Sequence, residues 1–308
     1  MQQAPVFTAE CAAELRDELR RLGAALCPFL PACSLTAAVF LLFFPKGPEA
    51  LLQSPWYFGY ALLCALLPML LCITLYLKLT ERRLSARLYR PTVCRRDFFA
   101  VTGIGLAALP LGAAAATLSD RLFDAAQIVS SAPLPKTIPT LLIFGLTRLL
   151  IAPILEELFF RGLILERLRR FGDGFAVFLS ALTFALLHAS AVHFLQALVM
   201  GLCFGIVSVR TGSCLSATVL HLLSNLLSAL RLCLPLSSHA GNAVFVAVLV
   251  LCAAVSAGIA LCRFSSKNTS FLKSGCLSAG KMLLMCLQSI PLMLFFIMSL
   301  YYTLWALR

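Results

Sequence analysis

Charged residues are scarce in this sequence, where they make up only 12% of 308 positions. A soluble domain carries about twice that fraction. Hydrophobic residues make up 61% of the chain, which is the composition of a polytopic membrane protein. The sequence also lacks internal repeats, low-complexity segments and a separate polar domain. Its basic residues flank apolar runs, which indicates membrane topology and argues against a nucleic-acid partner.

Two common metal-binding patterns are missing as well. The thirteen cysteines are scattered, and no two of them form a CxxC pair. We therefore interpret them as buried thiols, with neither a zinc cluster nor a disulfide framework. The sequence contains no HExxH, so the helix of the common zinc proteases is absent.

Apolar runs long enough to cross a bilayer predict an all-α membrane protein of eight or nine spans. The polar residues described below lead us to expect an intramembrane active-site cavity among these spans. These runs lie near 24–45, 57–77, 98–118, 138–160, 175–191, 192–210, 215–234, 242–262 and 282–305. We divide the chain into 1–137, an N-terminal interfacial helix with three spans; 138–235, which carries those polar residues and which we expect to be the catalytic core; and 236–308, the C-terminal spans. The distribution of lysine and arginine places the N-terminus in the cytoplasm, and we expect a bacterial-type inner (plasma) membrane.

The segment ILEELFFRG, residues 154–162, places two adjacent carboxylates and an arginine in an apolar run. A carboxylate near the middle of a membrane helix costs roughly 2.5–3.5 kcal/mol. Glu157 and Arg161 are four residues apart, so they share a helix face and can pair. Glu156 is turned about 100° away from Glu157 and is left as the free carboxylate. Ionisable residues in a span indicate a functional site.

Two histidines and an asparagine lie in later apolar runs. His188 follows Phe184 by one helical turn in FALLH, and Asn225 follows His221 by one turn in HLLSN. Counted from the charged ends of their runs, these groups and Glu156 lie at similar depths of a core about 30 Å thick. We therefore expect Glu156, His188, His221 and Asn225 to converge.

Hydrolysis of an amide bond fits this set of side chains. Glu156 and His188 could activate a water, and His221 with Asn225 could stabilise an oxyanion. A second interpretation makes Glu156, His188 and His221 the ligands of a catalytic Zn²⁺. The polar groups could instead serve a transporter as a proton relay, or a non-catalytic scaffold as contacts between helices.

The three patterns EELFFR, FALLH and HLLSN, in this order and each in a span, resemble those of the CPBP intramembrane proteases. This family includes the CAAX prenyl endopeptidases and bacteriocin-processing proteins, of glutamate type or metalloprotease type. The resemblance covers about residues 138–235 and implies an intramembrane endopeptidase. It implies that Glu156 and His188 activate water, that His221 and Asn225 bind the oxyanion, and that Glu157, Arg161 and Phe184 shape the site or hold the substrate. The implied partners are the lipid bilayer and a membrane-anchored or lipidated substrate, either a prenylated protein ending in Cys-a-a-X or a leader peptide.

Overall fold

The computed structural model describes residues 4–43, 54, 56–84, 86–125, 142–143, 145–233, 239–263, 273 and 275–305. Within these ranges the secondary structure consists of helices and contains no strand. The expectation of an all-α membrane protein is therefore confirmed.

The helices fall into three stretches of the chain. The first comprises α1 (Ala4–Leu26), α2 (Phe29–Phe43), α4 (Tyr57–Leu79), η1 (Ala86–Tyr89), α5 (Arg95–Gly105) and α6 (Ala108–Ala125). The second comprises η2 (Leu146–Ile151), α8 (Ala152–Glu157), η3 (Leu158–Leu165), α9 (Glu166–Leu168), η4 (Arg169–Phe171), α10 (Asp173–Leu187), α11 (Ala191–Thr211) and α12 (Leu215–Cys233). The third comprises α13 (His239–Arg263), α14 (Ala279–Gln288) and α15 (Ile290–Trp305).

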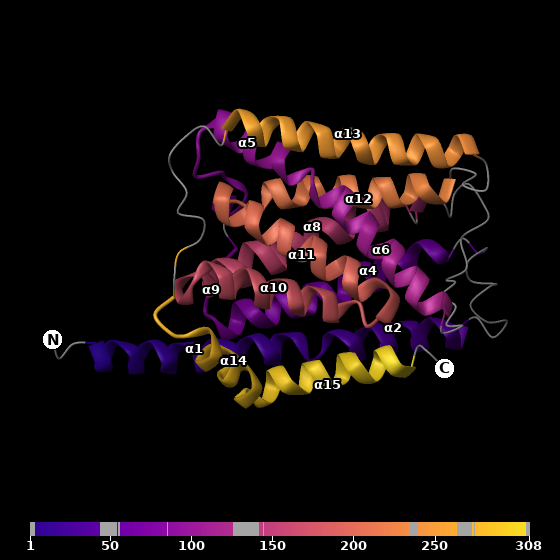
Figure 1. Ribbon diagram of the computed structural model, residues 1–308. Helices are drawn as coiled ribbons and strands as arrows, with labels where there is room; N and C mark the ends of the chain where they lie inside the picture. Colours follow the sequence, from indigo (N-terminus) through magenta and orange to yellow (C-terminus); the bar gives the residue numbers. More distant parts are fainter. Residues whose placement is uncertain are drawn as a thin grey trace.

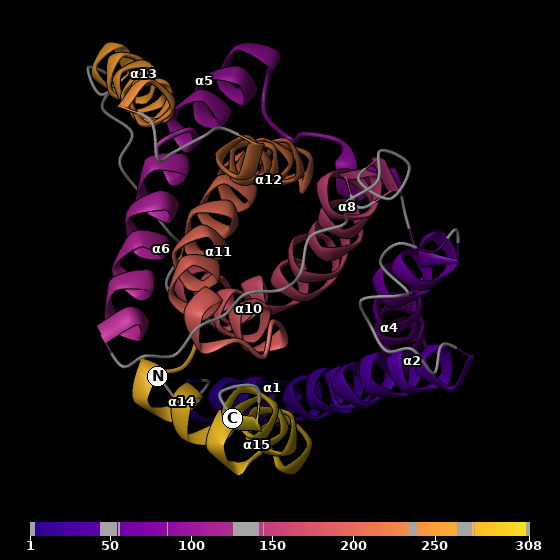
Figure 2. The ribbon, with the colours of Figure 1, turned by 90° about the vertical axis from the view of Figure 1, so that its right-hand side faces the viewer.

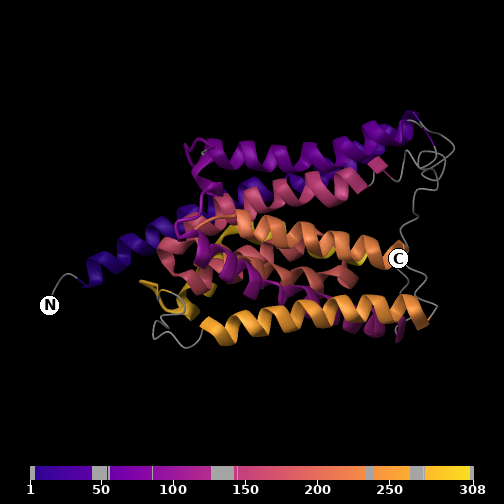
Figure 3. The same ribbon diagram turned by 90° about the horizontal axis from the view of Figure 1, so that it is seen from above.

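The long helices lie side by side along one direction (Figure 1). Viewed along that direction, α8, α10, α11 and α12 form an inner group (Figure 2). Helices α1, α2, α4 and α15 flank this group on one side, and α5, α6 and α13 flank it on the other. The first turns of α1 extend beyond the bundle at one end (Figure 3). The residues singled out by the three sequence patterns lie in this inner group, in η3 directly after α8, or directly after the end of α10.

Five helical stretches in the described part of the chain are long and apolar enough to cross a membrane. A sixth results if α14 and α15, which meet at a bend of 78°, count as one broken span. Two shorter apolar helices, α10 and α12, lie in the inner group. The count by this criterion is smaller than the eight or nine runs seen in the sequence. One reason is that the run at 138–160 contains helices of two kinds and the run at 175–191 ends after a helix of 15 residues.

The helix that carries the acidic pair is not a regular α-helix. A π-helical turn, η2, precedes α8, and a second one, η3, follows it. Pro153 lies in the first turn of α8 and has no backbone N–H to continue the preceding hydrogen-bond ladder. Single π-turns inside helices are frequently found at functional sites.

Helix α1 is held in the bundle by an apolar stripe. Leu15, Leu19, Leu22 and Leu26, spaced by three or four residues, are all buried, and α1 packs mainly against α15 and α4. Gly23 permits the close approach to α15, because a Cβ there would lie 2.1 Å from the backbone nitrogen of Leu292. One face of the segment expected to be an interfacial helix is thus packed against other helices, whereas Arg16, Asp17 and Arg20 on its other face are exposed.

One pair of cysteines corrects the interpretation of all cysteines as thiols. Cys11 of α1 and Cys276, just before α14, form a disulfide across 265 residues of sequence. Ten other cysteines in the described residues are free. The pairing could not be seen in the sequence, because it depends on the contact between the first helix and the C-terminal segment.

A buried ion-pair cluster joins α1 to the inner group, and we call Glu18, Tyr76, Arg167 and Arg170 the Glu18 cluster. The side chain of Glu18 is fully buried. Its Oε1 accepts a hydrogen bond from the Tyr76 hydroxyl. Its Oε2 accepts one from Nε of Arg167 at 2.6 Å and lies 3.5 Å from Nη2 of Arg170. The cluster therefore ties α1 and α4 to the end of the helix that carries the acidic pair.

Candidate active site

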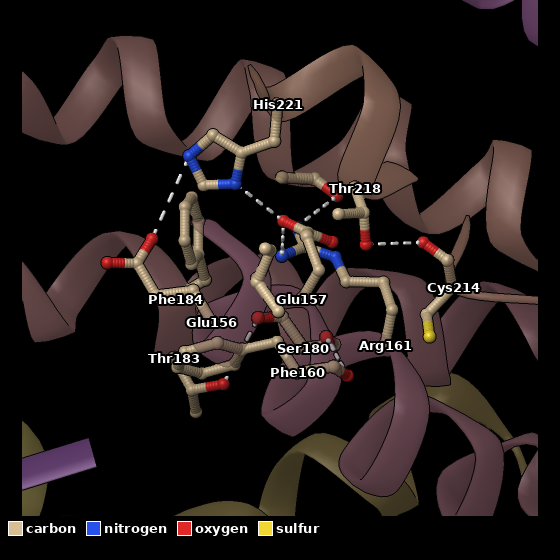
Figure 4. Close-up of polar contacts among 12 residues, drawn as sticks. Glu156, Glu157, Phe160, Arg161, Ser180, Thr183, Phe184, Cys214, Thr218 and His221 are labelled. Carbon is tan, nitrogen blue, oxygen red and sulfur yellow. Dashed lines mark hydrogen bonds and ion pairs between the residues drawn. The ribbon is translucent and has the colours of Figure 1, made fainter. Parts of the chain in front are cut away.

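The inner group brings the three sequence patterns together. Glu156 and Glu157 end α8, and Arg161 follows in η3. Phe184 comes from α10, and His221 comes from α12. Figure 4 shows these side chains pointing toward one another between the helices. Of the four residues expected to converge, Glu156 and His221 lie next to each other, and each of the three patterns contributes a side chain to this group.

Glu157 occupies the centre of the arrangement, and its side chain is completely buried. Its Oε1 lies 2.9 Å from Nη1 of Arg161, whose side chain is also completely buried. The pairing expected from the four-residue spacing is confirmed. The same Oε1 lies 2.8 Å from Nδ1 of His221. A charged pair in an apolar interior requires such additional hydrogen bonds, because both ions have lost their hydration.

Glu156 differs from its neighbour in exposure and in partners. Its side chain is 19% exposed, and its Oε2 lies 3.7 Å from Nε2 of His221. The imidazole of His221 thus lies between two carboxylates, with one ring nitrogen toward each (Figure 4). Glu157 is fully buried and paired with Arg161, whereas Glu156 is the partly exposed carboxylate of the two.

An aromatic ring connects the two histidines. The Phe184 ring meets His221 edge-on at a centroid distance of 5.7 Å and His188 at 4.9 Å. The guanidinium of Arg161 lies 4.7 Å from the centroid of the same ring. Phe184 therefore packs against the two imidazoles and the buried cation, and it helps to fix their relative positions.

His188 lies just after the end of α10 and is exposed. Its Nδ1 lies 2.9 Å from the carbonyl oxygen of Phe184, one turn earlier. No hydrogen bond or ion pair joins His188 to Glu156 in the described structure. The carboxylate expected to share a water with His188 is instead nearest to His221.

Asn225 lies one turn after His221 on α12. Its Nδ2 donates a hydrogen bond of 2.9 Å to the carbonyl oxygen of Arg148 in η2. The amide therefore links α12 to the π-turn that precedes the acidic pair. A primary amide has two N–H groups, and this bond uses one of them.

Of the three proposed zinc ligands, Glu156 and His221 lie next to each other, with 3.7 Å between Oε2 and Nε2. Among the described residues, no group of three or more His, Cys, Asp or Glu side chains could hold a metal ion. The contacts of His221 and His188 just described occupy Nδ1 of each ring. The ligand set of Glu156, His188 and His221 stays a prediction, and we derive no step through a metal.

Two residues of α11 belong to the site although the sequence interpretation missed them. The carbonyl oxygen of Gly201 accepts a hydrogen bond of 3.1 Å from Nη2 of Arg161. The Phe204 ring lies 5.3 Å from that of His221 and 5.6 Å from the guanidinium. The spacing of Gly201 and Gly205 is a small-xxx-small pattern, which indicates close contact between membrane helices and could have identified this face of α11.

A separate pocket lies between α6, α11, α12 and α13. It is partly open, has a cavity volume of about 30 Å³, and is lined by Leu109, Ala113, Ala116, Gln196, Ser224, Leu227, Ser228 and Phe245. None of the paired residues around Glu157 lines it.

A comparison with protein-family models matches residues 138–227 to "Type II CAAX prenyl endopeptidase Rce1-like". The matched segment begins before η2 and ends in α12, so it contains all three sequence patterns. No curated protein and no solved structure matches the chain. The match supports an endopeptidase activity in general, and it confirms the resemblance that the three patterns carry. Residues 138–227 are therefore similar to the Rce1-like type II CAAX prenyl endopeptidases, and this similarity supports the CPBP family for that segment of the chain.

Proposed function

We propose that this protein is an intramembrane endopeptidase that cleaves a membrane-associated substrate, with a prenylated C-terminal Cys-a-a-X segment as the first candidate. A lipidated leader peptide is the second candidate. The observation that carries the proposal is the imidazole of His221 between a buried, arginine-paired Glu157 and the partly exposed Glu156. A free carboxylate beside an imidazole is suited to proton transfer.

In the proposed reaction, Glu156 is the general base. Its carboxylate takes a proton from a water as the water oxygen bonds to the carbonyl carbon of the scissile amide. The carbonyl π electrons move to oxygen and form an oxyanion. When the oxyanion collapses, the C–N bond breaks and the amine leaves with the proton that Glu156 received. The products are a carboxylic acid and an amine, and the carboxylate is regenerated.

The remaining groups act around this step. His221 and Asn225 are the proposed donors to the oxyanion, and donors fixed before the reaction are the largest source of such stabilisation. His188 is the proposed second contact of the water, since its ring lies against the Phe184 ring that also contacts His221. The partial exposure of Glu156 and the exposure of His188 are consistent with contact to substrate and water.

The test uses the full-length protein in lipid nanodiscs and a farnesylated, fluorescence-quenched peptide ending in Cys-a-a-X. We expect cleavage by the wild type and a loss of about 10³-fold in kcat for Glu156→Gln, within the range of general-base contributions. The matched control is Glu166→Gln, on the same helical run, because Glu166 is about half exposed and pairs with Arg82 outside the site. Size-exclusion profiles and circular dichroism establish that both variants are folded.

The alternative functions predict different results. A scaffold cleaves neither the farnesylated peptide, nor its unprenylated form, nor an acylated leader peptide. A proton relay moves protons across proteoliposomes in a manner that depends on Glu156 without any cleavage. Full activity of Glu156→Gln would overturn the proposed role of Glu156, and preference for the leader peptide would replace the first substrate candidate by the second.

A further inference from the structure

The tautomer of His221 follows from its contacts. Oε1 of Glu157 accepts from Arg161, which has only donors, and the same oxygen lies 2.8 Å from Nδ1 of His221. An ionised carboxylate can only accept hydrogen bonds. Nδ1 of His221 therefore carries a proton and donates it to Glu157. With Nδ1 engaged, the ring can donate to an oxyanion only through Nε2, which has to carry a proton in that role. Nε2 lies 3.7 Å from Glu156.

Arg161 holds Glu157 in the place where this hydrogen bond forms. The guanidinium donates to Glu157 with one nitrogen and to the Gly201 carbonyl with another. It also lies within 6.0 Å of the ring centroids of Phe160, Phe184 and Phe204. Because the arginine is anchored to α11 and to aromatic rings of η3, α10 and α11, its carboxylate partner has little freedom to turn away from His221.

Gly201 allows this anchor to form. A Cβ at this position would lie 3.0 Å from Cβ of Ala181 and 3.3 Å from Nη2 of Arg161. A glycine inside a helix costs roughly 0.5–1 kcal/mol relative to alanine. Because Gly201 has no side chain, α11 can approach α10 closely at Ala181. The carbonyl oxygen of Gly201 can then accept the hydrogen bond from the guanidinium of Arg161.

We propose that Glu157 is a positioning residue that acts through His221, and that Arg161 and Gly201 hold it in place. This inference rests on the proposed function. Of the two roles that the resemblance left open for Glu157 and Arg161, it selects shaping of the site over holding of the substrate. The arrangement is comparable in logic to the carboxylate of a Ser-His-Asp triad, which sets the tautomer and orientation of its histidine.

Steady-state kinetics separate the two roles. Glu157→Gln is expected to lower kcat by about 10²–10⁴-fold, in the range of a lost tautomer or acid–base contribution, with KM unchanged within twofold. Loss of a substrate contact raises KM instead. Glu157→Asp retains the charge and is expected to recover part of kcat. If Glu157→Gln fails to fold with Arg161 left unpaired, the double variant Glu157→Gln/Arg161→Gln removes both charges and takes its place.

Gly201→Ala makes the smallest chemical change to the site, because it adds one methyl group and leaves every charged side chain in place. We expect a fall of about tenfold in kcat at constant KM, since small displacements of a positioned group reduce rates strongly. The matched control is Gly258→Ala on α13, where an added Cβ meets no atom within 4 Å. An unchanged kcat for Gly201→Ala would remove Gly201 from the proposal.

The tautomer itself can be measured without any turnover. The ¹⁵N imidazole resonances of the nanodisc-embedded wild type are recorded over a pH series, and His221 is assigned by subtracting the spectrum of His221→Asn. We expect Nδ1 to keep its proton while Nε2 loses one as the pH rises. Loss of the proton from Nδ1 instead, or a KM effect alone in Glu157→Gln, would overturn this inference. Failure of the proposed function has a different signature, which is full activity of Glu156→Gln or no cleavage by the wild type.

Discussion

Two fully buried glutamates, Glu18 and Glu157, stand in different surroundings. Both oxygens of Glu18 have partners. Oε1 accepts from the Tyr76 hydroxyl, and Oε2 accepts from Arg167 and lies near Arg170. These arginines keep their charge at every physiological pH. The carboxylate of Glu18 is therefore saturated with donors.

Glu157 has one occupied oxygen. Its Oε1 is shared by Arg161 and His221, whereas its Oε2 has no hydrogen-bond partner in the described residues. One of its partners is an imidazole, the side chain whose ordinary pKa is nearest to neutrality. A second carboxylate, Glu156, is near the far side of that ring.

The difference separates a structural use of a buried charge from a chemical one. A carboxylate that is paired only with permanent donors holds helices together but has no proton to exchange. A carboxylate that shares an imidazole with a neighbouring acid controls where a proton resides. Membrane burial alone therefore does not identify a functional acid. The hydrogen-bond and ion-pair partners of the carboxylate show whether its role is structural or chemical. Four changes test this distinction, in order of decreasing expected effect.

The largest effect is expected for Glu18→Ala, which leaves Arg167 and Arg170 facing a site without its acceptor. Removing one partner of a buried pair typically costs about 3–5 kcal/mol. Unfolding by SDS titration in mixed micelles, followed by circular dichroism, measures this loss. The folded fraction is expected to retain the wild-type kcat within twofold. A large fall in kcat with unchanged stability would contradict the structural assignment of the Glu18 cluster.

Asn225→Ala is expected to change kinetics more than stability. Loss of one oxyanion donor lowers kcat by on the order of 10²-fold or more. Loss of the hydrogen bond to the Arg148 carbonyl costs only about 0.5–1.5 kcal/mol of stability. The control is Ser228→Ala on the same helix, whose hydroxyl bonds to its own backbone at Ser224. A loss of stability without a loss of kcat would show that Asn225, like Glu18, has a structural role only.

Tyr76→Phe removes only the hydroxyl that donates to Glu18 and retains the ring that packs on Phe159 at 5.9 Å. Because the lost hydrogen bond is to a charged group, we expect a stability loss of about 1.5–3 kcal/mol and no change in kcat. Tyr302→Phe, at the exposed bond to Ser34, serves as the control. Equal stability of Tyr76→Phe and the wild type would show that the hydroxyl does not contribute.

The smallest effect is expected for Glu166→Gln. Its ion pair with Arg82 is about half exposed on both sides, and such pairs contribute about 0.2–1 kcal/mol. Added salt should reduce even this difference, since exposed charges are screened. The measurement is SDS unfolding at two ionic strengths. A loss as large as that of Glu18→Ala would mean that burial does not govern the strength of these pairs.

Much of the site could be predicted from the sequence. The cost of charge in a membrane singled out Glu156 and Glu157, and the four-residue spacing paired Glu157 with Arg161, as the structure confirms. Helical spacing placed Phe184 with His188, and their rings are in contact. These predictions succeeded because they depend only on the period of one helix.

Predictions that depended on two helices were less successful. Similar depth in the membrane suggested that Glu156 faces His188, but its nearest described partner is His221. Depth gives only the position of a residue along the membrane normal. The rotation of each helix about its axis and the π-turns around α8 determine which side chains meet. The disulfide between Cys11 and Cys276 and the burial of Glu18 were missed for the same reason.

The sequence by itself determined that the protein is helical, lies in a membrane and carries three motif-bearing helices, because hydropathy and helical period are local properties. Only the tertiary structure decided that His221 lies between the two acids, that Gly201 anchors Arg161, and that Glu18 is a structural counterpart of Glu157. These are contacts between helices, and they depend on how close the backbones approach and which faces they present. Spacing along one chain carries no information about that geometry.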